Sequence, residues 1–293
     1  MLIRNKVLLT LWLIGGLAWL ALSCAAWQQG TKWQRSVPGQ GFSGQGAREP
    51  RMKNRSEFPI WKVEVPFQAD VFTFVRIKYT SSDRSRFNRW SNDYPDSDWN
   101  FSYRIQELTS LKVDPNGRVL ELTDPDIFNY PFLFMNGVGS LQFDLDEALA
   151  LRRHLLNGGF LMVDDFWGER EWEDMKDQMK LVFPGKEPVD LPLSHDLFHI
   201  VYDFKVKPQV PDIRTWREGS YFETNHPLPH GDKLPHFQAY YDDQDRIVAL
   251  LCHNNDLGDG WEREGAQTDY FETFSVPFSY PMGINIIAYA MSH

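Results

Sequence analysis

Three apolar stretches of this 293-residue sequence end in polar side chains that could do chemistry. The clearest is the acidic doublet Asp164-Asp165, and the other two are Asn136-Gly137 and Asn255-Asp256. A carboxylate pair at the end of a strand can bind the hydroxyl groups of a ligand, hold a divalent metal ion, or share a proton for general acid-base catalysis. The alternative is that one aspartate caps backbone amides and the other is solvated. We take Asp164 and Asp165 as candidate catalytic residues and the other two pairs as candidate ligand-binding residues.

A pair of histidines, His195 and His199, offers a second kind of chemistry. Residues four apart share one face of a helix, which lets two imidazoles bind one metal ion. No glutamate follows the first histidine as it does in zinc proteases, so a third ligand would come from Asp164 or Asp165. His195 is then also a candidate catalytic residue of a metal-assisted hydrolase. The alternative is a short helix in which His199 is hydrogen-bonded against the core.

Aromatic and polar residues are interleaved over residues 89–104, which include Trp90 and Trp99. Aromatic planes beside carboxylates and amides are typical of carbohydrate sites, because the plane stacks on a sugar ring while the oxygens accept from its hydroxyl groups. The stretch 254–262 has a similar character, and Trp167 follows the acidic doublet. We expect Trp90, Trp99 and Trp167 to line a ligand site. A rigid loop that covers the core without a ligand would have the same composition.

The surrounding pattern predicts the elements that would position these residues. Runs rich in β-branched and aromatic residues predict strands over 71–79, 118–124, 131–139, 160–165, 237–243 and 246–253. Apolar residues at helical spacing predict helices over 101–112, 140–159, 169–183 and 279–293, the second with Asp144 and Glu147 in a capping box and Gly158 at its end. Strands and helices alternate, so we predict an α/β fold with a mostly parallel sheet covered by helices on both faces. Ligands bind beyond the carboxyl ends of the strands in such sheets.

The N-terminus predicts export. Arg4 and Lys6 precede an uncharged apolar run over residues 7–26, close to the roughly 20 residues that a membrane span needs. Small residues around Ser23 suit a signal peptidase, so cleavage and retention as a membrane anchor both stay open. With the positive charge inside, the body of the protein is periplasmic or extracytoplasmic in either case.

Composition along the chain divides it into an export segment (1–26), a basic Gly/Gln-rich tether (27–56) and a single α/β domain (57–293). Residues 1–56 hold a formal charge of +7 and the remainder −17, for a total of −10. A domain this acidic repels polyphosphate, so nucleic acid is excluded as a partner. The chain has no GxSxG, P-loop or GxGxxG motif, which disfavours serine-hydrolase, nucleotide-hydrolase and dinucleotide chemistry. No organic cofactor is predicted, and a divalent metal stays open.

Six ordered blocks carry a family resemblance, which extends over about residues 72–291. They are WSNDYPDSDWNFSYRIQELTSLKV, LTDPDIFNYPFLFMNGVG, LRRHLLNGGFLMVDDFWGE, LSHDLFHIVYDF, NNDLGDGWE and GINIIAYAM. Together they resemble the bacterial family named domain of unknown function 4159. The resemblance implies a flavodoxin-like or glutamine amidotransferase-like fold, export or membrane tethering, and envelope partners, since relatives are encoded near MoxR-type ATPases and von Willebrand factor A proteins. Asp164 and Asp165 stand where catalytic amidotransferases carry their cysteine, so that thiol chemistry does not transfer.

Three hypotheses follow from these observations. The first is a non-catalytic envelope module that binds a small polar ligand, such as a carbohydrate, or protein partners at the carboxyl edge of the sheet. The second is a hydrolase, with or without a metal, in which Asp164 or Asp165 acts with His195 or His199. The third is a structural partner domain without a ligand.

Overall fold

The computed structural model describes residues 55–64, 70–81, 89–223, 231, 233–264 and 267–293. The predicted export segment and all but the last two residues of the predicted tether lie outside the described residues. The chain divides into two units, 1–43 and 44–293, and everything below concerns the second. No helix in this described part is long and apolar enough to cross a membrane.

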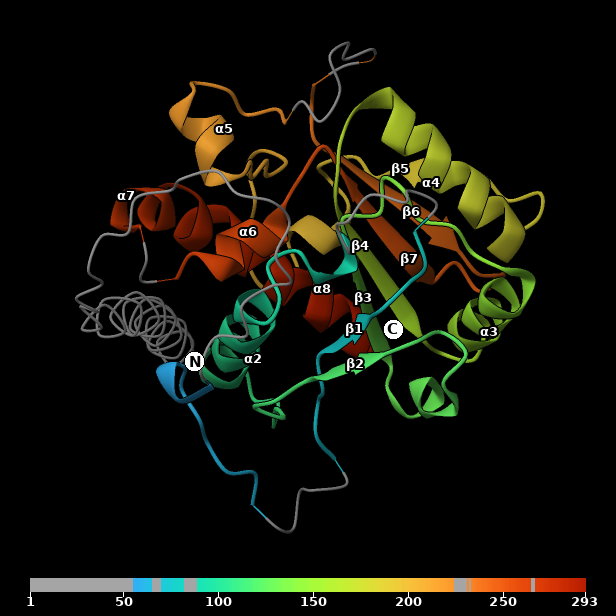
Figure 1. The fold of residues 1–293 in the computed structure, drawn as a ribbon, viewed down its shortest axis with the longest axis horizontal. Coiled ribbons are helices and arrows are strands. Elements are labelled where there is room, and N and C mark those ends of the chain that lie inside the picture. The colour runs from blue at the N-terminus through green and yellow to red at the C-terminus, as the bar shows by residue number, and fades with distance from the viewer. Residues whose placement is uncertain (1–54, 65–69, 82–88, 224–230, 232, 265–266) are drawn as a thin grey trace, which may run out of the picture. The chain divides into compact units, whose positions relative to one another are not determined.

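A mostly parallel sheet organises the described residues, as the sequence predicts (Figure 1). Its seven strands are β1 (Val75–Ile77), β2 (Arg118–Leu120), β3 (Phe132–Asn136), β4 (Phe160–Phe166), β5 (Val189–Asp190), β6 (His236–Tyr241) and β7 (Ile247–His253). They lie in the order β2-β1-β3-β4-β7-β6-β5. Strands β2, β1, β3, β4 and β7 run parallel to one another, and β6 is antiparallel to both of its neighbours, β7 and β5. Strands β6 and β7 overlap the strands predicted over 237–243 and 246–253.

The direction of winding reverses between β1 and β3. The chain steps outward from β1 to β2 and then returns to β3 on the other side of β1. Such a reversal opens a crevice beyond the carboxyl ends of the strands, where α/β proteins of this topology bind ligands. A ligand site is therefore expected at the edge where β3 ends in Asn136, β4 ends in Phe166 just after the acidic doublet, and β7 ends in His253.

Helices cover both faces of the sheet. The α-helices are α2 (Asp96–Leu108), α3 (Leu145–Leu156), α4 (Gly168–Val182), α5 (Ile213–Arg217), α6 (Leu257–Glu262), α7 (Thr268–Tyr270) and α8 (Tyr280–Ser292). Figure 1 shows α3 and α4 on one side of the sheet and α2, α6 and α8 on the other. Alternate strand residues serve the two sides: Leu133 and Leu161 belong to the core cluster shared with α3 and α4, whereas the ring of Phe134 packs against Trp261 of α6.

Local signals set several helix ends. Asp144 accepts a hydrogen bond from the Glu147 backbone, and the Glu147 carboxylate accepts from the Asp144 backbone, so the predicted capping box begins α3. Gly158, with φ of +100°, lies just past the end of this helix, where a left-handed residue is favoured. Asp256 caps α6 by accepting from the Asp259 backbone N–H.

Two predicted loops are partly helical. Helix α2 begins at Asp96 and not at residue 101, so half of the aromatic stretch expected to be a loop is helix. Residues 257–262, which belong to the second polar and aromatic stretch and for which no helix is predicted, form α6. Helix α6 tolerates both glycines because each lies against a neighbouring side chain at close range, Gly260 against Ser279.

Gly283 of α8 gives a test of this packing. A Cβ on Gly283 would lie 2.5 Å from the Phe101 ring and 2.9 Å from the Trp261 ring, and those two rings stack on each other with centroids 4.0 Å apart. Alanine is normally the better helix residue by about 1 kcal/mol. Here overpacking outweighs that gain, and we expect Gly283→Ala to lower the free energy of unfolding by about 1–3 kcal/mol in urea titrations. A gain in stability would show instead that the two rings can move aside.

Candidate functional site

The carboxyl ends of β3, β4 and β7 meet through backbone contacts. The Gly137 N–H donates to the Asp164 carbonyl at 3.1 Å, and the Asp165 N–H donates to the Asn255 carbonyl at 3.1 Å. The Gly258 N–H, at the start of α6, donates to Asp164 Oδ2 at 2.9 Å. The structure therefore brings together the predicted residues Asn136, Asp164, Asp165 and Asp256 at one edge of the sheet.

A buried ion pair delivers the loop before α2 to the same edge. Arg76, in the middle of β1, is fully buried and binds Asp98 through both Nε and Nη2. Its remaining Nη1 donates to the carbonyls of Trp90 at 2.9 Å and Asn92 at 3.1 Å. Arginine can hold several acceptors at once because its donors form a rigid fork. The carbonyls fixed in this way set the position of Asp93.

Three acceptor oxygens converge on one point beside the Gly258 Cα. The position that a Cβ would take there lies 3.1 Å from Asp93 Oδ2, 3.3 Å from Asp256 Oδ1 and 3.5 Å from Asn136 Oδ1. Asn136 is fully buried, and its Oδ1 has no hydrogen-bond partner among the described residues. The same holds for Asp164 Oδ1. Buried acceptors without a donor are unusual, and each calls for a ligand, a water molecule or a proton.

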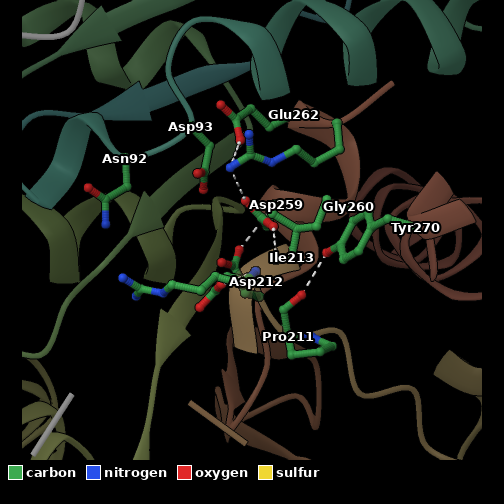
Figure 2. A network of polar contacts seen from close by, with 12 residues as sticks. Asn92, Asp93, Pro211, Asp212, Ile213, Asp259, Gly260, Glu262 and Tyr270 are labelled. Carbon is green, nitrogen blue, oxygen red and sulfur yellow. Dashed lines mark hydrogen bonds and ion pairs between the residues drawn. The ribbon is translucent and has the colours of Figure 1, made fainter. Parts of the chain in front are cut away.

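Further carboxylates extend this group. Asp165, Glu223 and Asp256 each place one oxygen within 4.8 Å of the others, and so do Asp93, Asp259 and Glu262. We call these two sets the Asp165 triad and the Asp93 triad, and the six residues together the acidic centre. Figure 2 shows Asp93, Asp259 and Glu262 close together, with Asp212 nearby.

Within the described residues, only the Asp93 triad forms ion pairs with a basic side chain. Arg263 Nη2 lies 2.8 Å from a Glu262 oxygen and 3.3 Å from Asp259 Oδ1. No lysine or arginine of the described part forms an ion pair with Asp165, Glu223 or Asp256, although these carboxylates are only 4–8% exposed. Burying several like charges without a counter-charge is costly.

The raised pKa values of the carboxyl groups in the acidic centre reflect this cost. Burial raises the pKa of Asp165 to about 7, against the opposing effects of the Asn92 hydrogen bond and the Arg89 charge. Burial, with the Asp165 charge added, raises the pKa of Glu223 to about 10. The pKa values of Asp93 and Asp256 are also well above the ordinary range because both carboxyls are buried and face other carboxyls. Perturbed acids gathered at one place are a common mark of functional sites.

At this edge of the sheet, three residues other than glycine have left-handed backbone conformations. Asp93, Asp165 and Asn254 have φ values of +63°, +53° and +56°. Aspartate and asparagine tolerate this region better than other side chains. At residue 165 the turn directs both carboxylate oxygens to donors, Oδ2 to Asn92 Nδ2 at 3.1 Å and Oδ1 to Trp167 Nε1 at 3.3 Å.

Asn255, a predicted ligand-binding residue, acts as a brace. Its Oδ1 accepts from the Val210 N–H at 2.8 Å and its Nδ2 donates to the Pro208 carbonyl at 2.9 Å. These bonds fix the segment that leads to Asp212, whose N–H donates to Glu223 Oε1 at 2.6 Å. Asn255 therefore supports Glu223 from a distance, with both of its amide atoms already bonded.

The three candidate tryptophans lie in different places. Trp167 contacts Asp165 and packs edge-on against Phe222, and it is 3% exposed. Trp99 is buried under Phe58 and donates to the Asn116 carbonyl, near the start of β2 and away from the acidic centre. Trp90 packs against the core. The expectation that all three line one site does not match the structure, because the start of α2 at Asp96 turns Trp99 toward the core.

The two candidate histidines lie apart from the acidic doublet. His195 caps a short 3₁₀ helix (Asp196–Phe198), and its Nε2 faces the Tyr241 hydroxyl at 3.4 Å. Tyr241 pairs with Ile247 at the opposite edge of the sheet, where β7 begins. His199 binds Asp203 at 2.6 Å and the Leu193 carbonyl at 2.7 Å. The predicted metal or hydrolase arrangement of Asp164 or Asp165 with His195 or His199 is not formed, because the expected helix is only a single 3₁₀ turn between the two histidines.

A family model covers most of the chain. The model described as Domain of unknown function (DUF4159) matches residues 73–291, which include the whole sheet and the acidic centre. The chain belongs to the DUF4159 family. The resemblance seen in the sequence blocks is thereby confirmed. A comparison with curated proteins gives no match.

Several site residues of this DUF4159 protein could not be assigned from the sequence. Glu223, Asp212 and Arg76 carry no local motif, and Glu223 lies 58 positions after Asp165. Asp93, Asp259 and Glu262 were within polar stretches that the sequence marks as aromatic and acidic, but nothing in their spacing predicts that the two stretches meet. An acidic residue followed by glycines, as in residues 256–260, is the one local signal that could have suggested α6 as a site helix.

Proposed function

We propose that this DUF4159 protein is an exported or membrane-tethered envelope module that binds a small polar ligand, such as a carbohydrate, at the carboxyl edge of its sheet. The observation that carries this proposal is the convergence of Asn136 Oδ1, Asp93 Oδ2 and Asp256 Oδ1 on one space beside Gly258. All three are acceptors, so they suit a ligand rich in hydroxyl or ammonium donors. Asp164 Oδ1, which also has no donor, adds to this preference.

The side chains near Asp164 and Asp165 favour ligand binding without catalysis. The hydrolase hypothesis pairs Asp164 or Asp165 with His195 or His199, and the two histidines contact Tyr241 and Asp203 instead. Cys252 is fully buried within β7, and burial raises the pKa of its thiol, so it is not a nucleophile. The side chains that meet at the edge are instead acceptors held in fixed positions.

The finer fold assignment is also a proposal. The order β2-β1-β3-β4-β7 is the 2-1-3-4-5 order of flavodoxin-like sheets. In a glutamine amidotransferase-like protein the nucleophile would follow the strand after α3, which here is β4 with Asp165 at a left-handed turn. We propose an amidotransferase-like scaffold whose nucleophile position has become part of an acceptor site. The export segment 1–26 would present this site outside the cytoplasmic membrane, beside partners such as MoxR-type ATPases or von Willebrand factor A proteins.

A binding screen tests the proposed function. The purified protein is titrated with a panel of mono- and oligosaccharides and polyols, with tryptophan fluorescence and calorimetry as readouts. We expect Asp93→Asn to weaken binding at least about tenfold, since Asp93 Oδ2 borders the proposed site and a hydrogen bond to a charged acceptor contributes about 1.5–3 kcal/mol. Asparagine is chosen because it tolerates the positive φ of residue 93.

Asp146→Asn serves as the matched control, because it removes one exposed carboxylate from the surface of α3. It should leave ligand affinity unchanged. If no compound of the panel changes fluorescence or heat, or if both variants lose affinity equally, the carboxyl edge is not a site for such ligands.

A further inference from the structure

We propose that the acidic centre contains a binding site for one divalent cation of the calcium type, in the space bordered by Asn136 Oδ1, Asp93 and Asp256. This inference deepens the proposed function, since the cation would lie at the same edge as the polar ligand. It uses none of the histidines suggested by the sequence. The remaining carboxylates of the acidic centre would surround the cation without all contacting it.

The orientation of the Asn136 amide is the first support. Its Nδ2 donates to the Asn92 backbone carbonyl at 3.3 Å and to Asp93 Oδ2 at 3.0 Å. A backbone carbonyl can only accept, so the amide nitrogen must face Asn92, and the oxygen must face the space beside Gly258. A fully buried amide oxygen without a donor is therefore directed at carboxylate oxygens. Oxygens that face one another in this way are held together by a cation or by a proton.

Charge gives the second support. Within the described residues the Asp165 triad has no ion-paired lysine or arginine, whereas Arg263 already offsets Asp259 and Glu262 of the Asp93 triad. The part of the acidic centre nearest Asp256 is thus the part with the least positive charge. A divalent ion there would supply the missing counter-charge at the point where the three oxygens converge.

The donor set indicates the class of cation. Among the described residues, every ligand atom that borders the space is a carboxylate or amide oxygen, and none comes from a histidine or cysteine. Hard cations prefer such oxygens, whereas zinc and copper prefer nitrogen and sulfur. Calcium takes six to eight oxygens in flexible geometry, and magnesium keeps several waters and one or two carboxylates. Several protein carboxylates around one space therefore favour calcium.

Gly258 provides the most selective test. An added Cβ would lie 3.1–3.5 Å from the three bordering oxygens and would fill the space, although the substitution removes no ligand and no charge. Gly258 lies in α6 without a positive φ, so alanine suits the backbone. We expect Gly258→Ala to fold and to lose cation binding. Asp256→Asn should lose it also, while asparagine keeps the helix cap.

The experiment is calorimetric titration of chelator-treated full-length protein with CaCl₂ and, separately, MgCl₂. Trp-sensitised terbium luminescence is the second readout. We expect one calcium ion per chain with Kd below about 1 mM, weaker binding of magnesium, and a loss of at least about 100-fold in Gly258→Ala and Asp256→Asn. Asp146→Asn, which removes one negative charge as Asp256→Asn does but at a distant surface position, should bind calcium as the unaltered protein does.

Three results would overturn the inference. They are no binding of calcium at millimolar concentration, tighter binding of magnesium than of calcium, and unchanged calcium affinity in folded Gly258→Ala. In the first case protons, and not a cation, join the facing oxygens.

The two proposals fail separately. Repeating the sugar and polyol screen with calcium and with chelator distinguishes them. Calcium binding without any ligand contradicts the proposed function and leaves the cation site standing. Ligand binding that is equal in calcium and chelator, together with no calcium heat, supports the function and contradicts the cation site.

Discussion

Asp98→Asn is expected to lower the free energy of unfolding by about 3–5 kcal/mol, because it leaves the fully buried Arg76 without its counter-charge. The Arg76 Nη2 to Asp98 Oδ1 distance is 2.5 Å, and the two side chains are 0% and 5% exposed. Urea titration followed by circular dichroism measures the change. Glu121→Gln is the matched control. It removes the ion-pair partner of Lys78, which lies two residues after Arg76, and the two side chains of this pair are 51% and 57% exposed. That control should change stability by less than about 1 kcal/mol.

A double variant separates the stability of this pair from its role at the site. Arg76→Met with Asp98→Leu replaces two buried charges by apolar groups, which restores much of the lost stability in comparable cases. The double variant still lacks the donors to the Trp90 and Asn92 carbonyls. It should therefore fold well and bind calcium or the polar ligand more weakly, because Asp93 is no longer held in place. Similar losses of stability in Asp98→Asn and Glu121→Gln, or full binding by the double variant, would contradict this role for Arg76.

The elements with strong local signals were predictable from the sequence. The strands that end in Asn136 and Asp165 are continuous apolar runs, and helix α3 has a capping box and a terminal glycine, so each is specified by residues within a few positions. The convergence of those strand ends also follows from a general rule, because parallel strands end at the same edge. The loop before α2 was misassigned, since its polar composition hides a helix that begins at Asp96.

The site itself was predictable only in part. Strand topology leads to Asn136, Asp164, Asp165 and Asp256. Glu223 is instead held by the Asp212 N–H, at the end of a segment that Asn255 fixes through the Val210 N–H, and no local pattern predicts these contacts. His195 and His199 show the opposite case, in which a local pattern predicts a site that the structure does not form. Their spacing of four suits a helix, but the segment between them is a single 3₁₀ turn, and it lies against the amino end of β7. Spacing arguments hold only where the assumed element forms.

The stability of the cation-free protein is expected to fall as pH rises from about 5 to about 8. The folded pKa values of Asp165, about 7, and Glu223, about 10, are above their ordinary values of 3.8 and 4.5. Between the ordinary and the folded values the folded state binds more protons than the unfolded state, so the slope of stability with pH is negative. Stability is highest below about pH 4 for these two groups alone. The stabilisation from the raised pKa of Asp165 is lost as the pH rises to about 7, and that from Glu223 is lost as the pH rises to about 10.

Between pH 6 and 8 we expect a decrease of about 1–3 kcal/mol, because each pKa unit of separation contributes at most about 1.4 kcal/mol and neighbouring carboxyls share protons. Urea titrations at several pH values, in chelator, measure this decrease. Glu223→Gln should flatten the profile, since glutamine keeps the acceptor for the Asp212 N–H and cannot ionise. Calcium should raise stability more at pH 8 than at pH 6, because it competes with protons for the same oxygens. A rise in stability from pH 6 to 8 in chelator would mean that the carboxyls of the acidic centre are already ionised and neutralised within the folded protein.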